Sequence, residues 1–152
     1  MEDFKKILYP IALTEISPNI APYVVTLARQ LDAQVHLLHV LRSFDWFVNT
    51  YVEESPKPDF KRIASDFENQ ILQQAQQKLE KFKQKHLKGV QIEKATVVRG
   101  THYRQILDYA KSEGIDLIIM GTGTKAQKLM FGSVTGKVSR LSKVPVMLVK
   151  SG

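Results

Sequence analysis

Residues 120–137 of the chain, MGTGTKAQKLMFGSVTGK, combine residue types that bind anions. The segment contains four glycines, three threonines, one serine and three lysines, and it contains no aspartate or glutamate. Glycine lets a backbone N–H group approach a ligand closely, and hydroxyl groups and lysine donate hydrogen bonds to phosphate oxygens. Because the segment follows the apolar run DLIIMG, it predicts a phosphate-binding loop at the end of a strand. The alternative is a turn that only holds the fold together.

Two common phosphate-binding motifs do not fit this segment. In the P-loop pattern, the glycine that should precede Gly136-Lys137 falls on Phe131. In the dinucleotide fingerprint, Gly121 and Gly123 fit, but the third glycine falls on Ala126. The segment also follows the fourth expected strand, whereas that fingerprint follows the first strand of its unit.

A strand, a loop and a Gly-Ser pair that opens a helix remain as the local pattern. Gly132 allows close approach, and the first turn of a helix has unpaired N–H groups with a partial positive charge. Ser133 and Thr135 add hydroxyl donors. This pattern favours an anion at the helix start, although Ser133 could also serve only as the helix cap.

The net charge of +7 is concentrated in the same region. Residues 121–152 contain six lysines and arginines and no acid, so the preceding residues are close to neutral. The excess predicts an anionic partner, with a solvated basic face as the alternative. The chain has no cysteine, which excludes disulfides, thiol catalysis and cysteine-ligated zinc.

Hydrophobic periodicity predicts the elements that position this segment. Short apolar runs predict strands over 5–13, 34–41, 90–98, 115–121 and 144–150, and helical spacing predicts helices over 17–33, 59–89, 99–114 and 132–142. Such alternation is typical of one α/β domain, residues 1–152, with an open five-stranded parallel sheet and helices on both faces. Residues 43–58 are expected to form a long loop. Ligands of such sheets bind where the strand order reverses, at the carboxyl ends of the strands.

The helix predicted over 59–89 has one apolar stripe that is expected to be buried: Ile63, Phe67, Ile71, Leu72, Ala75, Leu79 and Phe82. The first residues, MEDFKKILYP, include two acids and no apolar segment of signal-peptide length. No apolar run approaches the roughly 20 residues that span a bilayer. A cytoplasmic protein without a membrane partner is therefore expected.

The runs ILYP, LLHV, DLIIMGT and GSVTGKVSRLSKVPVMLVK together resemble the universal stress protein family, and the resemblance extends from Lys5 to Lys150. It implies a Rossmann-like fold of the adenine nucleotide alpha-hydrolase-like type and a homodimer that pairs through the C-terminal strand. Some members bind ATP and others do not. The resemblance therefore implies a stress-response regulatory or signalling module that binds ATP or AMP, with or without a Mg²⁺ ion.

The resemblance also assigns roles to individual positions. Gly132, Ser133, Val134 and Thr135 match the start of the phosphate-binding helix. Met120 and Gly121 match the turn beside the sugar and phosphates, with Gly123 as a displaced match. Val40 matches the position whose backbone meets the adenine, and Pro10 matches the end of the first strand.

The chain departs from the family's ATP-binding pattern in two places. That pattern, G-x2-G-x9-G-[ST], is two residues longer than the spacing from Gly121 to Gly132-Ser133. ATP-binding members also have an aspartate where this chain has Ala12. These departures support the alternative, a dimeric interaction protein of the same fold that binds no nucleotide. Nucleic acid is a third and weaker choice of partner, because a basic surface without a base-reading motif binds mainly nonspecifically.

No catalytic or metal-binding set is recognisable in the sequence. His36 and His39 are three residues apart on one strand, so they should point to opposite faces and cannot both ligate one metal. His102 follows a threonine that should cap a helix, and its side chain is expected in solvent, with an approach to the strand ends as the alternative. Without a general base aimed at the γ-phosphate, a nucleotide should be hydrolysed slowly or not at all.

Overall fold

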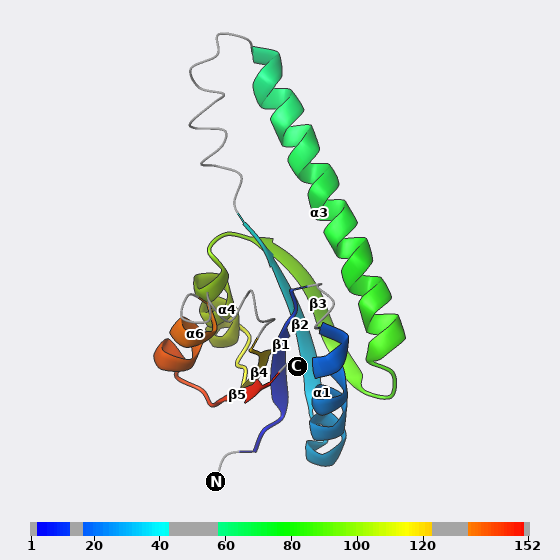
Figure 1. Ribbon diagram of the computed structural model, residues 1–152, viewed down its shortest axis with the longest axis vertical. Helices are drawn as coiled ribbons and strands as arrows, with labels where there is room; N and C mark the ends of the chain where they lie inside the picture. The colour runs from blue at the N-terminus through cyan, green and yellow to red at the C-terminus, as the bar shows by residue number, and fades with distance from the viewer. Residues whose placement is uncertain (1–2, 13–16, 43–57, 123–133, 151–152) are drawn as a thin grey trace.

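The computed structural model describes residues 3–12, 17–42, 58–122 and 134–150 (Figure 1). Along the chain, the elements are β1 (Lys6–Pro10), α1 (Ser17–Leu31), β2 (Gln34–Leu41), α3 (Pro58–His86), β3 (Gln91–Arg99), α4 (His102–Ser112), β4 (Leu117–Gly121), α6 (Thr135–Leu141) and β5 (Val146–Val149). The predicted long loop lies mostly outside the described residues.

The five strands form one parallel sheet in the order β3-β2-β1-β4-β5. This order confirms the predicted α/β fold. The strand order reverses between β1 and β4, so the ligand-binding position of open α/β sheets lies at the carboxyl ends of these two strands. We call the side of the sheet where the strands end its carboxyl edge.

Two apolar clusters cover the two faces of the sheet. On one face, residues of α1 and α3 pack against strand residues such as Leu37. On the other face, residues of α4 and α6 pack against strand residues such as Leu38. Because successive strand side chains point to opposite faces, a strand covered on both sides must be apolar at nearly every position. The sequence of β2, QVHLLHVL, has this property, and its predicted bounds were confirmed.

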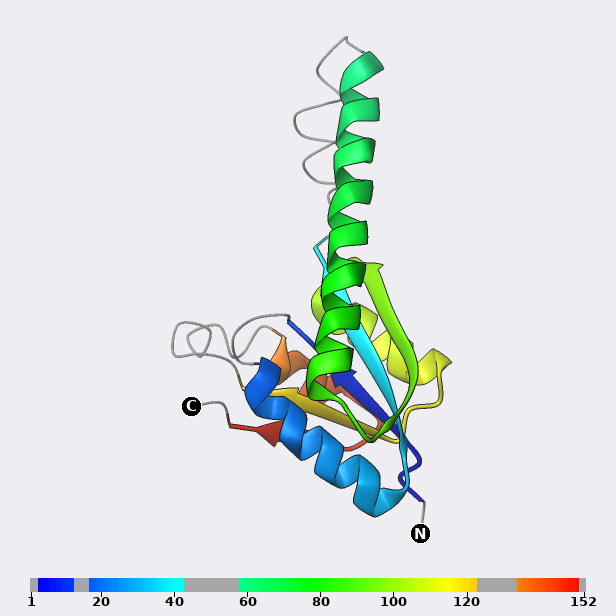
Figure 2. The same cartoon turned by 90° about the vertical axis from the view of Figure 1, so that its right-hand side faces the viewer.

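The buried stripe predicted for α3 was only partly right. Ala75, Leu79 and Phe82 are buried in the second half of the helix, but Ile63 and Phe67 are 62% and 51% exposed. The first half of α3 extends beyond the sheet, as Figure 2 shows. The helical period predicted which residues share one face, but it does not determine whether another element covers that face.

The junction between β1 and β4 is the shortest in the sheet. Its register includes two positions, Ile7 opposite Leu117 and Leu8 opposite Ile118, whereas β1 pairs with β2 at five. At the start of the junction, the Asp116 carboxylate accepts hydrogen bonds from the backbone N–H groups of Lys5 and Lys6, each at 2.9 Å. A carboxylate that accepts two N–H groups is a strong hydrogen-bonding arrangement, so Asp116 joins the two halves of the sheet at their amino end.

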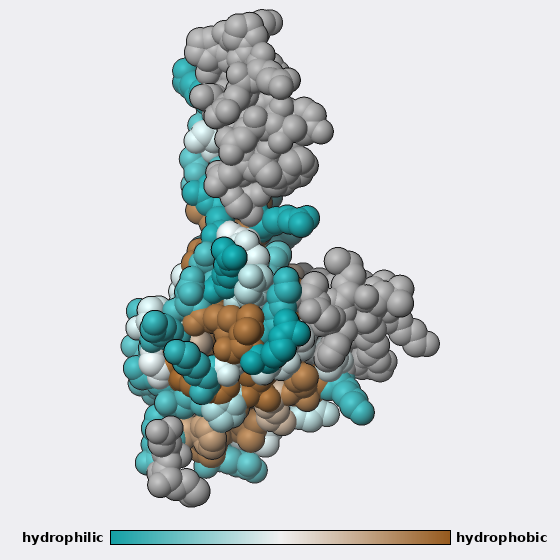
Figure 3. Space-filling model, turned by 90° about the vertical axis from the view of Figure 1, so that its left-hand side faces the viewer, coloured by the Kyte–Doolittle hydropathy of each residue, from teal (hydrophilic) through white to brown (hydrophobic). Residues whose placement is uncertain are grey.

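β5 forms an edge of the sheet, as expected for the C-terminal strand. Its neighbouring residues Met147 and Leu148 are 37% and 36% exposed, so neither face of this short strand is fully covered. Figure 3 shows an apolar area surrounded by polar residues on the side of the molecule that α6 and β5 form. No helix among the described residues has both the length and the apolar character needed to cross a bilayer.

Candidate functional site

On the β1 side of β2, no strand residue lies opposite Val40, which is in register with Val98 of β3 on the other side. The Ile11 N–H donates to the Leu38 carbonyl at 2.8 Å, so Leu38 faces β1. The Gly100 N–H donates to the Leu41 carbonyl at 2.9 Å, so Leu41 faces the β3 side. Backbone groups of successive strand residues point to opposite neighbours, so Val40 faces the same side as Leu38. β1 has already ended at Pro10. The N–H and carbonyl of Val40 can therefore pair with a planar polar ligand in place of a strand.

The other described site residues of the first and fourth strands lie at the same edge. Pro10 is the last residue of β1, and Met120 and Gly121 are the last residues of β4. Met120 and Val40 belong to one buried cluster, although β1 lies between their strands. Gly121 still pairs with Val149, which agrees with the strand predicted over 115–121, and its role beside the sugar and phosphates stays a prediction. The chain leaves the strand one residue later, because the Thr122 N–H also donates to the Val149 carbonyl at 3.0 Å.

The expected phosphate-binding helix begins later than predicted. α6 starts at Thr135, and Val134 occupies the cap position with helical backbone angles and no side-chain cap hydrogen bond. Val134 packs against the cluster that contains Met120 and Val40, which brings the start of α6 toward the end of β4. The remaining predicted residues, Gly123, Gly132 and Ser133, lie outside the described residues.

His102 is a residue of the carboxyl edge that the sequence interpretation placed in solvent. The ring lies close enough to the backbone of Val40 for this group to affect its pKa. Burial lowers the pKa of His102, as do the nearby His39 and Arg42, while the backbone of Val40 raises it. A backbone group that raises this pKa favours the charged ring, so the Val40 carbonyl is directed at a ring N–H. His102 therefore already lies beside the backbone group that a base would meet.

A turn at Gly100 positions His102. Gly100 has φ +147°, a conformation that favours glycine, and an added Cβ would lie 2.7 Å from the Gln105 amide nitrogen. The next residue, Thr101, occupies the helix cap position, but its side chain forms no cap hydrogen bond, so the predicted capping role was wrong. Sequence reasoning favoured solvent for His102 over the strand ends, because its contact depends on the path of this turn. The signal for the strand ends was its position at a helix start, two residues after Gly100.

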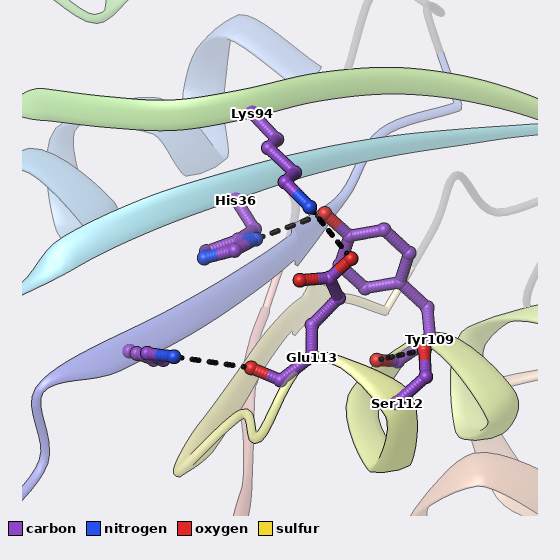
Figure 4. Close-up of polar contacts among 6 residues, drawn as sticks. His36, Lys94, Tyr109, Ser112 and Glu113 are labelled. Carbon is purple, nitrogen blue, oxygen red and sulfur yellow. Dashed lines mark hydrogen bonds and ion pairs between the residues drawn. The ribbon is translucent and has the colours of Figure 1, made fainter.

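His36 and His39 point to opposite faces, as predicted. The Nδ1 atom of His39 lies 2.6 Å from the Ile11 carbonyl oxygen. His36 is 1% exposed, and its Nδ1 lies 2.9 Å from the hydroxyl of Tyr109 on α4. Its buried Nε2 has no hydrogen-bond partner within the described part of the chain. Figure 4 shows this pair beside the ion pair of Lys94 and Glu113, which measures 2.8 Å.

The buried His36 should make the protein sensitive to acid. Burial lowers the pKa of His36, and the charge of Glu113 only partly opposes this. Unfolded histidine binds a proton below about pH 6.5, while the folded protein resists protonation at this ring until a lower pH. The contribution of the neutral His36 ring to the free energy of unfolding is thus fully present above about pH 6.5 and is lost as the pH falls. The slope of this loss is at most about 1.4 kcal/mol per pH unit. Urea unfolding of wild type and His36→Leu between pH 7.5 and 5 measures this slope, which should be smaller in the variant. Equal slopes would contradict the prediction.

Comparison with known proteins shows to which family this chain belongs. The profile of the Universal stress protein family matches residues 3–150. The chain belongs to this family. It is 30% identical to universal stress protein MJ0577 of Methanocaldococcus jannaschii, over 97% of this chain and 95% of that protein. It is also 30% identical to universal stress protein YxiE of Bacillus subtilis, over 97% of this chain and 99% of that protein.

Solved structures of this family share the fold. The structure of MJ0577 superposes with a TM-score of 0.80 at 27% identity and covers 99% of each chain. A family protein from Arabidopsis thaliana with AMP bound gives a TM-score of 0.61 at 20% identity, over 97% of this chain and 92% of that one. A universal stress protein in complex with cAMP gives 0.60 at 18% identity, over 99% of this chain and 100% of that one.

Proposed function

We propose that this universal stress protein binds an adenine nucleotide, ATP or AMP, at the carboxyl edge of its sheet, as a regulatory or signalling module. The observation that supports this proposal most directly is the backbone of Val40, which faces a position beyond the end of β1. The Val40 N–H is a donor, and its carbonyl, which has a second lone pair besides the one directed at His102, is an acceptor; together they suit the polar edge of a base. Family structures that hold AMP and cAMP support adenine as that base.

The phosphates would extend from this position toward β4 and α6. Thr135 begins α6, and the resemblance assigns it with Gly132 and Ser133 to the phosphate-binding segment. The lysines and arginines of residues 121–152 supply positive charge without a competing acid. The described residues contain no cluster of three or more histidine, aspartate or glutamate residues that could hold a metal.

The nucleotide would act by favouring one conformation of the protein over another. A ligand shifts such an equilibrium only by its difference in affinity for the two states.

Asp116, the acid nearest to the start of β4, binds backbone N–H groups at the amino end of the sheet, away from the expected phosphates. We therefore expect slow or no hydrolysis.

The proposal predicts that freshly purified protein retains a nucleotide. Native mass spectrometry should show a mass increase equal to AMP or ATP, which heating and ultrafiltration would release for identification. Calorimetry with added ATP measures the affinity of the emptied protein. A clean ligand-free mass together with no heat of binding at millimolar ATP would favour the alternative, an interaction protein of the same fold, which Ala12 and the short loop support.

A further inference from the structure

The first turn of α4 connects the two ends of the proposed site. His102 lies beside the backbone of Val40, where the base is expected. The next residue, Tyr103, contacts Lys137 of α6, whose ammonium lies 4.7 Å from the centroid of the tyrosine ring. α4 and α6 pack against each other on one face of the sheet (Figure 1). Consecutive residues of one helix therefore reach the base end of the site and the helix expected at the phosphate end.

Tyr103 contacts two cationic side chains. The Arg104 Nε donates a hydrogen bond to the Tyr103 hydroxyl oxygen at 3.1 Å, while Lys137 lies over the ring. This bond from Arg104 and the charges of Arg104 and Lys137 lower the pKa of Tyr103, against a smaller opposing effect of burial. The electrostatic potential at this point is therefore positive, as an anion requires.

Lys137 has no acidic partner among the residues that the structure describes. Its contact with a tyrosine ring is a cation–π interaction, worth about 0.5–1 kcal/mol at an exposed site, which a phosphate can replace or share. Helical side chains lean toward the N-terminus of their helix, so Lys137 leans toward the carboxyl edge. Arg104 has Asp108 one turn further along α4, which contributes a favourable charge to it. Of the two cations, Lys137 is therefore the less neutralised.

We propose that Lys137, with Arg104 as its neighbour, binds the terminal phosphates of a nucleoside triphosphate and so makes this protein prefer ATP over AMP. The inference rests on the proposed nucleotide site, but it concerns only the length of the phosphate chain. AMP carries one phosphate near the sugar, whereas ATP adds two phosphates and about two further negative charges that a side-chain cation can contact. An ammonium or guanidinium bonded to phosphate forms charge-assisted hydrogen bonds, which are about twice as strong as neutral ones.

The test is the ratio of ATP to AMP affinity, measured by calorimetry on emptied protein at constant ionic strength. Lys137→Gln should weaken ATP binding about five- to tenfold and leave AMP binding within about twofold. Arg104→Gln should have the same direction and a smaller effect. Lys137→Arg should preserve the preference, because it retains the charge. Lys143→Gln is the matched control, since it removes the same charge from an exposed lysine that follows α6.

Several outcomes would overturn the inference while the proposed function stands. These are equal affinity of wild type for ATP and AMP, equal weakening of both ligands by Lys137→Gln, or an equal effect of Lys143→Gln. Raising the salt from about 50 to about 300 mM should also weaken ATP binding more in wild type than in Lys137→Gln. Salt screens the contact between the Lys137 ammonium and the phosphates, which the variant does not have. If wild type bound neither nucleotide, the proposed function would fail and this inference with it.

Discussion

Gly132→Asp is expected to abolish ATP binding without unfolding the protein. The resemblance places Gly132 and Ser133 at the phosphates, so an aspartate there adds bulk and a negative charge where an anion should bind. Ser133→Ala removes one hydroxyl, and a hydrogen bond to a charged group is worth about 1.5–3 kcal/mol, or about ten- to a hundredfold in affinity. Calorimetry with ATP on both variants and wild type measures these losses.

Ser139→Ala provides the matched control for the serine variant. Ser139 lies on α6, and its hydroxyl donates to the Gly136 carbonyl at 3.0 Å, within the same helix. Its removal should leave ATP affinity unchanged. Circular dichroism and urea unfolding should show that all three variants fold. If Gly132→Asp bound ATP as well as wild type does, the nucleotide would have to sit elsewhere.

Lysine substitutions on β5 should convert a homodimer into a monomer. The edge strand exposes Met147 and Leu148, and exposed apolar edges invite pairing with another strand. The resemblance implies that this strand pairs with its counterpart across a two-fold axis. Four partly exposed side chains, two from each protomer, would then contribute about 1 kcal/mol each, so their replacement should weaken the dimer about a thousandfold.

Sedimentation velocity at micromolar concentration tests this prediction. Wild type should sediment as a dimer, and Met147→Lys combined with Leu148→Lys should sediment as a monomer. Ile63→Lys is the control, because Ile63 is 62% exposed on α3, which packs on β3 and β2 at the edge of the sheet opposite β5. A wild type that is monomeric at this concentration, or a double variant that stays dimeric, would refute pairing through β5.

The sequence predicted elements well where both faces of an element are covered. The apolar run of β2 marks its own ends, and Gly89 and Gly114 close the turns after α3 and α4 with φ of +81° and +65°. Prediction was weaker at positions that depend on distant parts of the chain. Ile63 follows the period of a buried helix face, yet nothing in the local pattern tells whether a sheet lies beneath it.

The same limit applies to the site. The resemblance named Val40 and Pro10, and the observed strand order places the ends of their strands side by side, while their contact with a nucleotide stays a prediction. For His102 the sequence favoured solvent over the strand ends, because its contact with Val40 requires the backbone turn at Gly100. The pairing of Tyr103 with Lys137 depends on how α4 packs against α6, which no local pattern encodes.

The short junction between β1 and β4 gives a bound ligand a mechanical role. Ile7 and Leu117 are far apart in the chain, so closing this junction carries a large loop-closure entropy for only two paired positions. Asp116 fastens its amino end, and a nucleotide held by both halves of the sheet would fasten the carboxyl end. Because the ligand would bind only the joined form, each tenfold rise in its concentration above the dissociation constant would add about 1.4 kcal/mol to the free energy that holds the two halves of the sheet together. The cell's nucleotide concentration would thus set how firmly the protein is held together.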